Sequence, residues 1–141
     1  MITNERQYAI TRAQAEQFKE SLTRFGSAEQ KLDPVVRGAM RLGLQSQLKD
    51  LQAEIAEYEA LKAGTTRKFV SNSLADLAVG LIKARIARGL TQRELAEKLN
   101  INERQIQRYE STLYEGAALR RLQEVADALN VKIREEITLE R

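Results

Sequence analysis

The strongest constraint in this sequence is a run of twenty residues, 92–111, in which two helical segments are separated by only three residues. The letters of this run are QRELAEKLNINERQIQRYES. Thr91, followed three residues later by Glu94, forms a capping box that starts the first segment, and Asn102 can cap the second. Because the connection is so short, we expect the two helices to meet at a sharp corner.

The side chains around this corner divide into an inward and an outward set. Asn100 lies at the bend, and Asn tolerates left-handed backbone better than other ordinary residues except Gly. Ala96 is small enough for the position where the helices approach most closely. The spacing predicts that the following apolar residues point inward: Leu95, Leu99, Ile101, Ile106 and Tyr109. The outward face of the second helix carries long polar side chains that suit the reading of base edges: Glu103, Arg104, Gln107 and Arg108.

The charge of the chain is concentrated near this run. Residues 1–64 hold 9 Lys/Arg and 9 Asp/Glu, residues 65–108 hold 9 and 4, and residues 109–141 hold 5 and 7. A local positive patch favours a polyanion such as nucleic acid, since phosphate contacts supply much of the affinity. The alternative is an ordinary solvated basic face.

Four short patterns fall at the spacings of a known family. They are Gly89-Leu90-Thr91-Gln92, Leu95-Ala96-x-x-Leu99, Ile106-x-Arg108-Tyr109-Glu110 and Leu122-x-x-Val125-Ala126-x-x-Leu129. With them, residues 74–130 resemble the helix-turn-helix of the Cro and phage-repressor family, often called the XRE family. The chain departs from that family at Asn100, where Gly is common, and at Ser111–Glu115, which lengthen the loop before Gly116.

The resemblance implies binding to double-stranded DNA. The second helix of the motif would enter the major groove, where Arg104 and Arg108 can bind guanine, Gln107 adenine and Glu103 cytosine. Gln92 would clamp a phosphate at the start of its helix. The remaining contacts to the DNA backbone are expected from Thr91, Arg93, Asn102, Arg67, Lys68, Thr112 and Tyr114. Three further cations could touch phosphates or remain solvated: Lys83, Arg88 and Lys98.

The resemblance also assigns a structural pair. Arg85 and Glu110 align with two family residues that join the first helix of the domain to the end of the recognition helix. We therefore expect them to form an ion pair inside the domain and to make no contact with DNA.

The N-terminal region predicts two longer helices. Thr11, with Gln14 three residues later, resembles a capping box, and we expect a first helix over residues 12–25. Asp33 before Pro34 predicts the start of a helix of about thirty residues that runs to Gly64. Its seam is Leu44, Leu48, Leu51, Ile55 and Tyr58. This seam either packs on Phe18, Leu22 and Phe25 as an antiparallel hairpin or binds a second copy or another partner.

Short, capped segments follow. They predict helices over 73–89, 92–99, 102–111 and 118–129, and residues 131–139 alternate in polarity as a short strand or a frayed tail would. The predicted fold is all-α: an N-terminal helical hairpin with one long helix, a four-helix repressor-like domain, and a C-terminal strand or tail. The expected domains are 1–64, a linker 65–73, the helix-turn-helix domain 74–130, and 131–141.

Composition excludes most catalytic chemistry. The chain has no Cys and no His, so thiolate nucleophiles, imidazole acid-base groups and the usual zinc sites are absent. We therefore expect no enzyme activity, no catalytic residues, no metal and no cofactor. No apolar run approaches the roughly 18 residues of a membrane span, and we expect a cytoplasmic protein with no membrane partner.

Two functions remain. The first is a sequence-specific transcriptional regulator, in particular a repressor, acting as a homodimer with recognition helices about 34 Å apart. The dimer contact would come from the seam or from residues 131–139. The second is a protein-binding module, because the helical extension with its run Ile55–Glu59 is loosely similar to HigA-type antitoxins. Those proteins neutralise a ribonuclease toxin and repress their own promoter, which would make a protein toxin a partner here.

Overall fold

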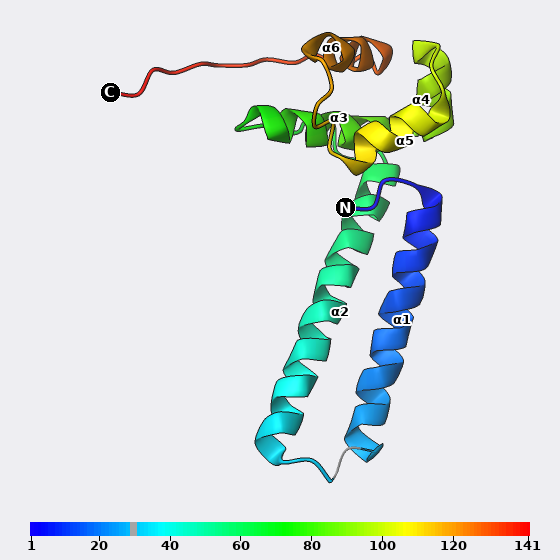
Figure 1. Ribbon diagram of the computed structural model, residues 1–141, viewed down its shortest axis with the longest axis vertical. Coiled ribbons are helices and arrows are strands. Elements are labelled where there is room, and N and C mark those ends of the chain that lie inside the picture. The colour runs from blue at the N-terminus through cyan, green and yellow to red at the C-terminus, as the bar shows by residue number, and fades with distance from the viewer. Residues whose placement is uncertain (29–30) are drawn as a thin grey trace. The chain divides into compact units, whose positions relative to one another are not determined.

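The computed structural model describes residues 1–28 and 31–141, and the regular structure in these ranges is entirely helical (Figure 1). The predicted all-α class is confirmed. The chain divides into two compact units, residues 1–60 and 61–141, and each is described by itself. The helices are α1 (Glu5–Ala28), α2 (Pro34–Lys62), α3 (Leu74–Ala87), α4 (Gln92–Leu99), α5 (Glu103–Ser111) and α6 (Leu119–Ala128).

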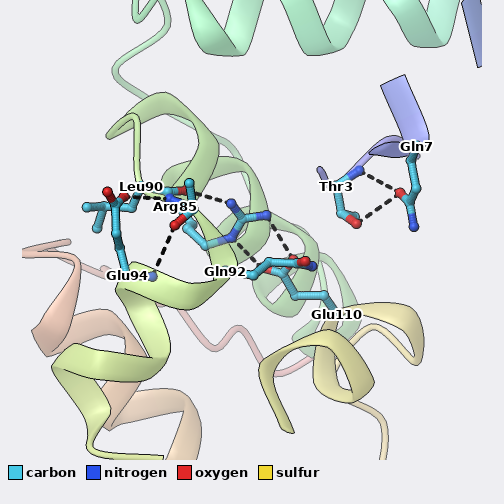
Figure 2. Close-up of polar contacts among 8 residues, drawn as sticks. Thr3, Gln7, Arg85, Leu90, Gln92, Glu94 and Glu110 are labelled. Atoms are coloured by element: carbon cyan, nitrogen blue, oxygen red, sulfur yellow. Dashed lines mark hydrogen bonds and ion pairs between the residues drawn. The ribbon is translucent and has the colours of Figure 1, made fainter. Parts of the chain in front are cut away.

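Helix α1 begins earlier than the sequence pattern suggested. The Oδ1 atom of Asn4 accepts a hydrogen bond from the backbone N–H of Gln7 at 2.9 Å. Gln7 Oε1 in turn accepts from the backbone and hydroxyl of Thr3 at 2.9 and 3.0 Å (Figure 2). Thr11 lies inside the helix, and its hydroxyl donates to the Gln7 carbonyl oxygen at 2.8 Å. The predicted capping box at Thr11 is therefore wrong, because Asn4 and Gln7 already cap the helix upstream.

Helix α2 begins where it was predicted. Asp33 Oδ1 accepts from the backbone N–H of Val35 at 2.8 Å, and Pro34 occupies the first helical position, where its missing N–H costs nothing. The helix ends at Lys62, and Gly64 follows with a φ of 69°, a left-handed conformation that suits Gly.

In the unit of residues 1–60, α1 and α2 run antiparallel (Figure 1). The rings of Tyr8 and Tyr58 lie 5.1 Å apart, and the Tyr58 hydroxyl donates to Glu5 Oε1 at 3.0 Å. The Tyr8 hydroxyl donates to Glu59, and this hydrogen bond raises the pKa of Tyr8. Where the two helices face each other, Phe25 of α1 and Tyr58 of α2 are buried. Tyr58 is the last residue of the seam, and the other four seam residues are half-buried. Of the two alternatives for the seam, packing against α1 and binding of a second copy or partner, this arrangement corresponds to the first.

The unit of residues 61–141 has an aliphatic core built by four helices. Helix α4 packs on α5 and α6, and α3 packs on α6. The guanidinium of Arg88 donates to the carbonyl oxygens of Leu129 and Asn130 at 3.0 and 2.8 Å. Arg88 therefore donates hydrogen bonds to carbonyl groups at the end of α6. Neither of the two alternatives for this residue, a phosphate contact or a solvated cation, includes this role. The largest fully buried apolar side chains are Leu81, Ile82, Ile86, Leu95, Ile106, Val125 and Leu129.

Residues 131–141 contain no strand in the structure, and the side chains of Ile137 and Leu139 are exposed. Of the two alternatives for this segment, the strand does not form in a single chain. Among the described residues, none of the helices combines the length and the apolar character needed to cross a membrane.

Candidate nucleic-acid interface

The corner between α4 and α5 is held by its backbone and caps. Thr91 Oγ1 accepts from the backbone N–H of Glu94 at 3.1 Å, and Glu94 Oε2 accepts from the N–H of Thr91 at 2.8 Å. Asn100 closes α4 in the left-handed conformation, with φ 56° and ψ 43°. Asn102 Oδ1 then accepts from the N–H of Arg104 at 2.9 Å and starts α5. Because caps act on both sides of a three-residue connection, the direction of α5 relative to α4 is closely defined.

A buried polar network lies at the other ends of the two helices, where α4 begins and α5 ends (Figure 2). Arg85 binds Glu110 in a bidentate manner, with Nε to Oε1 at 2.5 Å and Nη2 to Oε2 at 2.9 Å, and both side chains are buried. Arg85 Nη1 also donates to the carbonyl oxygen of Leu90 at 2.7 Å. The network connects α3, the turn before α4 and the end of α5. A buried charge pair is tolerable only when such hydrogen bonds satisfy it.

Gln92 is the third member of this network. Only 6% of the residue is exposed, and its Nε2 donates to Glu110 Oε2 at 2.8 Å. The phosphate contact expected from Gln92 requires a side chain at the surface, whereas the structure places it inside, where it satisfies a carboxylate oxygen. No local sequence pattern indicates this contact, because Glu110 lies 18 residues further along the chain.

Tyr114 is also buried, with 4% exposed, although a contact to the DNA backbone was expected from it. Its ring stacks on Tyr109 with centroids 5.4 Å apart, and Leu113 and Tyr114 turn the chain with positive φ values of 52° and 58°. The hydroxyl has no hydrogen-bond partner among the described residues. Burial and then the charge of Glu110 raise the pKa of Tyr114 well above its usual value. The lengthened loop therefore places the aromatic ring of Tyr114 in the core.

The outward face of α5 is open. Arg104, Gln107 and Arg108 are exposed, and no ion pair joins either arginine to a carboxylate in the part of the chain that the structure describes. Glu103 is half-buried and lies within 3.4 Å of the Gln107 Nε2 atom. Two unpaired guanidinium groups therefore project from a helix whose other side is anchored by Ile106 and Glu110.

The residues from which contacts to the DNA backbone were expected differ in their exposure and in their partners. Arg93 is exposed and pairs with Glu97 at 3.3 Å, an exposed contact that contributes little. The hydroxyl of Thr112 lies 3.0 Å from the Arg108 carbonyl oxygen, to which it donates. The other residues expected to contact the DNA backbone lie at the surface, and they are Arg67, Lys68, Thr91 and Asn102. Within residues 1–28 and 31–141, no group of His, Cys, Asp and Glu could hold a metal ion.

The comparisons with known proteins agree with this geometry. Residues 81–135 match the family model described as Helix-turn-helix. No curated protein and no solved structure matches the chain. The matched segment contains the corner, the buried network and the outward face of α5. The chain therefore carries, in residues 81–135, a helix-turn-helix domain of the XRE family, the kind of domain by which regulators bind DNA.

Proposed function

We propose that this protein is a sequence-specific transcriptional repressor that reads double-stranded DNA with α5. One observation carries the proposal: the exposed side of α5 presents unpaired cations, while its opposite side is fixed by a buried network. A rigid helix with free donors is what the major groove accommodates. Such a regulator would act in the cytoplasm, where it meets the chromosome.

The base contacts are proposed for the outward face. The guanidinium groups of Arg104 and Arg108 can each donate two hydrogen bonds to guanine, and the amide of Gln107 can pair with adenine. Glu103 can accept from cytosine once its weak contact with Gln107 is released.

The contacts to the DNA backbone are proposed for surface groups in the segment before α3, at the starts of α4 and α5, and just after the end of α5. Asn102 uses Oδ1 for its cap, so its Nδ2 is the group that would donate to phosphate. Arg67, Lys68 and Arg93 would supply charge, and Thr91 and Thr112 hydroxyl groups. The buried side chains of Gln92 and Tyr114 are not included.

A two-fold dimer is part of the proposal. A single domain of this size covers too little DNA for strong specific binding, and two recognition helices about 34 Å apart would meet successive major grooves.

The test begins with selection of bound sequences from a random duplex pool, followed by competition binding on the selected and scrambled duplexes. Replacing Arg104 or Arg108 with Ala should cost about 1 to 3 kcal/mol on the selected site, because one bidentate base contact is lost. Lys68→Ala should weaken both duplexes equally, since phosphates carry no sequence information. Arg24→Ala, an exposed change on α1, serves as the matched control and should alter neither.

An equal loss on both duplexes for Arg104→Ala and Arg108→Ala would reassign these residues to phosphate contacts. If the wild-type chain selects no sequence from the pool, the proposal of sequence-specific binding fails.

A second candidate is a protein-binding role in which the chain neutralises a toxin, with DNA binding secondary. It is favoured by the compact unit of residues 1–60, which lies outside the matched helix-turn-helix segment. Co-expression with the proteins encoded beside this gene tests it. A complex that survives Arg104→Ala together with Arg108→Ala would support this role, and the absence of any complex would contradict it.

A further inference from the structure

The side of α2 opposite the seam carries a second line of mainly apolar residues, and this one is exposed. The side chains of Val35 and Leu42 are large and apolar, and these residues are 80% and 68% exposed. Steps of four and three residues keep the line on one side of the helix over four heptads. We call it the outer line, and its eight members, all exposed, are Val35, Ala39, Leu42, Ser46, Lys49, Ala53, Ala56 and Ala60.

The charges of α2 are divided between its halves. Residues 34–48 hold two arginines and no acid, and residues 49–62 hold two lysines and four acids. This order opposes the helix dipole, which favours acids at the N-terminus and bases at the C-terminus. Arg37 and Arg41 have no acidic partner among the described residues, and with Pro34 and Gly38 they line a shallow depression. An antiparallel helix of the same sequence would bring the acidic half of one copy to the basic half of the other.

We propose that the outer line of α2 is the docking surface for a second copy of this chain, with the two α2 helices antiparallel about a two-fold axis. One register uses every member of the line, and its axis passes through the middle of the helix near Leu48. In that register each large apolar side chain faces a small one, which lets the helices approach closely. The facing pairs are Val35 with Ala60, Ala39 with Ala56, Leu42 with Ala53, and Ser46 with Lys49.

The same register matches the flanking charges. Glu59 of one copy faces Gly38 of the other, in the depression between Arg37 and Arg41. Gly38 leaves space there, since apart from its two chain neighbours and the backbone of its own helix nothing lies within 4 Å of the position that a Cβ would take. Lys49 can lay its aliphatic stem along the interface and extend its ammonium group to water. A register displaced by one heptad leaves either Val35 and Ala39 or Ala56 and Ala60 beyond the end of the partner helix, depending on the direction of the shift, so the register centred on Leu48 is the favoured one.

This surface would supply the dimer contact that the proposed function needs, but its test requires no DNA. The full-length chain is measured by sedimentation equilibrium, with Ala53→Arg as the variant and Gln47→Arg as the matched control. Both positions are exposed, and Arg is nearly as good a helix former as Ala, so circular dichroism should show equal helix content. We expect the wild type and the control variant to form dimers with the same dissociation constant. In Ala53→Arg the dissociation constant should rise by about a hundredfold or more, because the two-fold axis places two new charges in the interface.

The register is tested by disulfide cross-linking, which is clean because the chain has no Cys of its own. A mixture of Leu42→Cys and Ala53→Cys chains under mild oxidation should give a covalent heterodimer. Each variant alone should remain uncross-linked, because its two cysteines would lie about 16 Å apart along an antiparallel pair.

Three results would overturn the proposal. One is a wild-type chain that stays monomeric at high concentration. Another is efficient cross-linking of Leu42→Cys alone, which would indicate a parallel pair. The third is a dimer that persists in Ala53→Arg but dissociates in Ile137→Lys, which would assign the contact to the C-terminal segment.

Discussion

The two units of this protein bury their side chains very differently. Every one of the large side chains that is less than 2% exposed lies between residues 81 and 129, and none lies in residues 1–60 of the described chain. Within residues 61–141 the four helices cover one another from several directions, whereas within residues 1–60 each helix of the hairpin has one neighbouring helix. A helix with one neighbour can bury only one side, so Val35 and Leu42 remain in water. The comparison teaches that two antiparallel helices leave one side of each helix exposed, whereas four helices can enclose an aliphatic core.

The largest expected effect separates the two units. Arg85→Ala leaves Glu110 charged and buried without its partner, which typically costs about 3 to 5 kcal/mol. We expect residues 61–141 to unfold and DNA binding to disappear, while α1 and α2 keep their helical signal in circular dichroism. Arg93→Ala, which removes an exposed pair, should change the melting temperature little. An unaltered melting curve for Arg85→Ala would show that the buried pair does not hold the unit together.

An intermediate effect compares the two cores directly. Ile106→Ala should lower the free energy of unfolding by about 2 to 5 kcal/mol, because the side chain is fully buried and its removal leaves a cavity. Leu48→Ala, on the half-buried seam, should cost less, about 1 kcal/mol, since less apolar area is lost. Urea unfolding of both variants measures the difference. Equal losses would mean that the hairpin is packed as tightly as the second unit, contrary to the comparison above.

The smallest expected effect concerns Tyr114. Its hydroxyl is buried without a partner among the described residues, so Tyr114→Phe should change stability at pH 7 by no more than about 1 kcal/mol. Its pKa is raised in the folded state, so above about pH 10 the unfolded chain loses a proton that the folded chain keeps. Stability of the wild type should therefore be complete below pH 10 and fall as the pH rises above it. Tyr114→Phe should fall less steeply, and identical alkaline slopes in urea titrations would contradict the buried position.

Much of the helix-turn-helix unit could be predicted because its signals are local. Thr91 with Glu94, Asn100 at the corner and Asn102 before α5 each act over three or four residues, and the helices formed at the predicted positions. The burial of Gln92 was missed because it depends on where Glu110 arrives in space, a separation of 18 residues. Capping patterns contain no information about such contacts.

The hairpin was harder to predict in detail. The start of α2 follows from Asp33 and Pro34, but Thr11 looked like a cap and lies inside α1 instead. Ser and Thr followed by Glu or Gln occur inside helices as well as at their starts, so the pattern alone cannot place an end. The two apolar lines of α2 have the same spacing, and only the position of α1 distinguishes the covered line from the outer one.

The separation between the buried network and the outward face of α5 has a consequence for how such a protein can change. Arg85, Gln92 and Glu110 set the pose of the helix, while the side chains of Arg104 and Arg108 take no part in that network. If Arg104 and Arg108 read bases as proposed, substitutions at these two positions would redirect the protein to a different operator without disturbing the network that keeps the domain folded. New targets would then become accessible to a lineage one surface residue at a time.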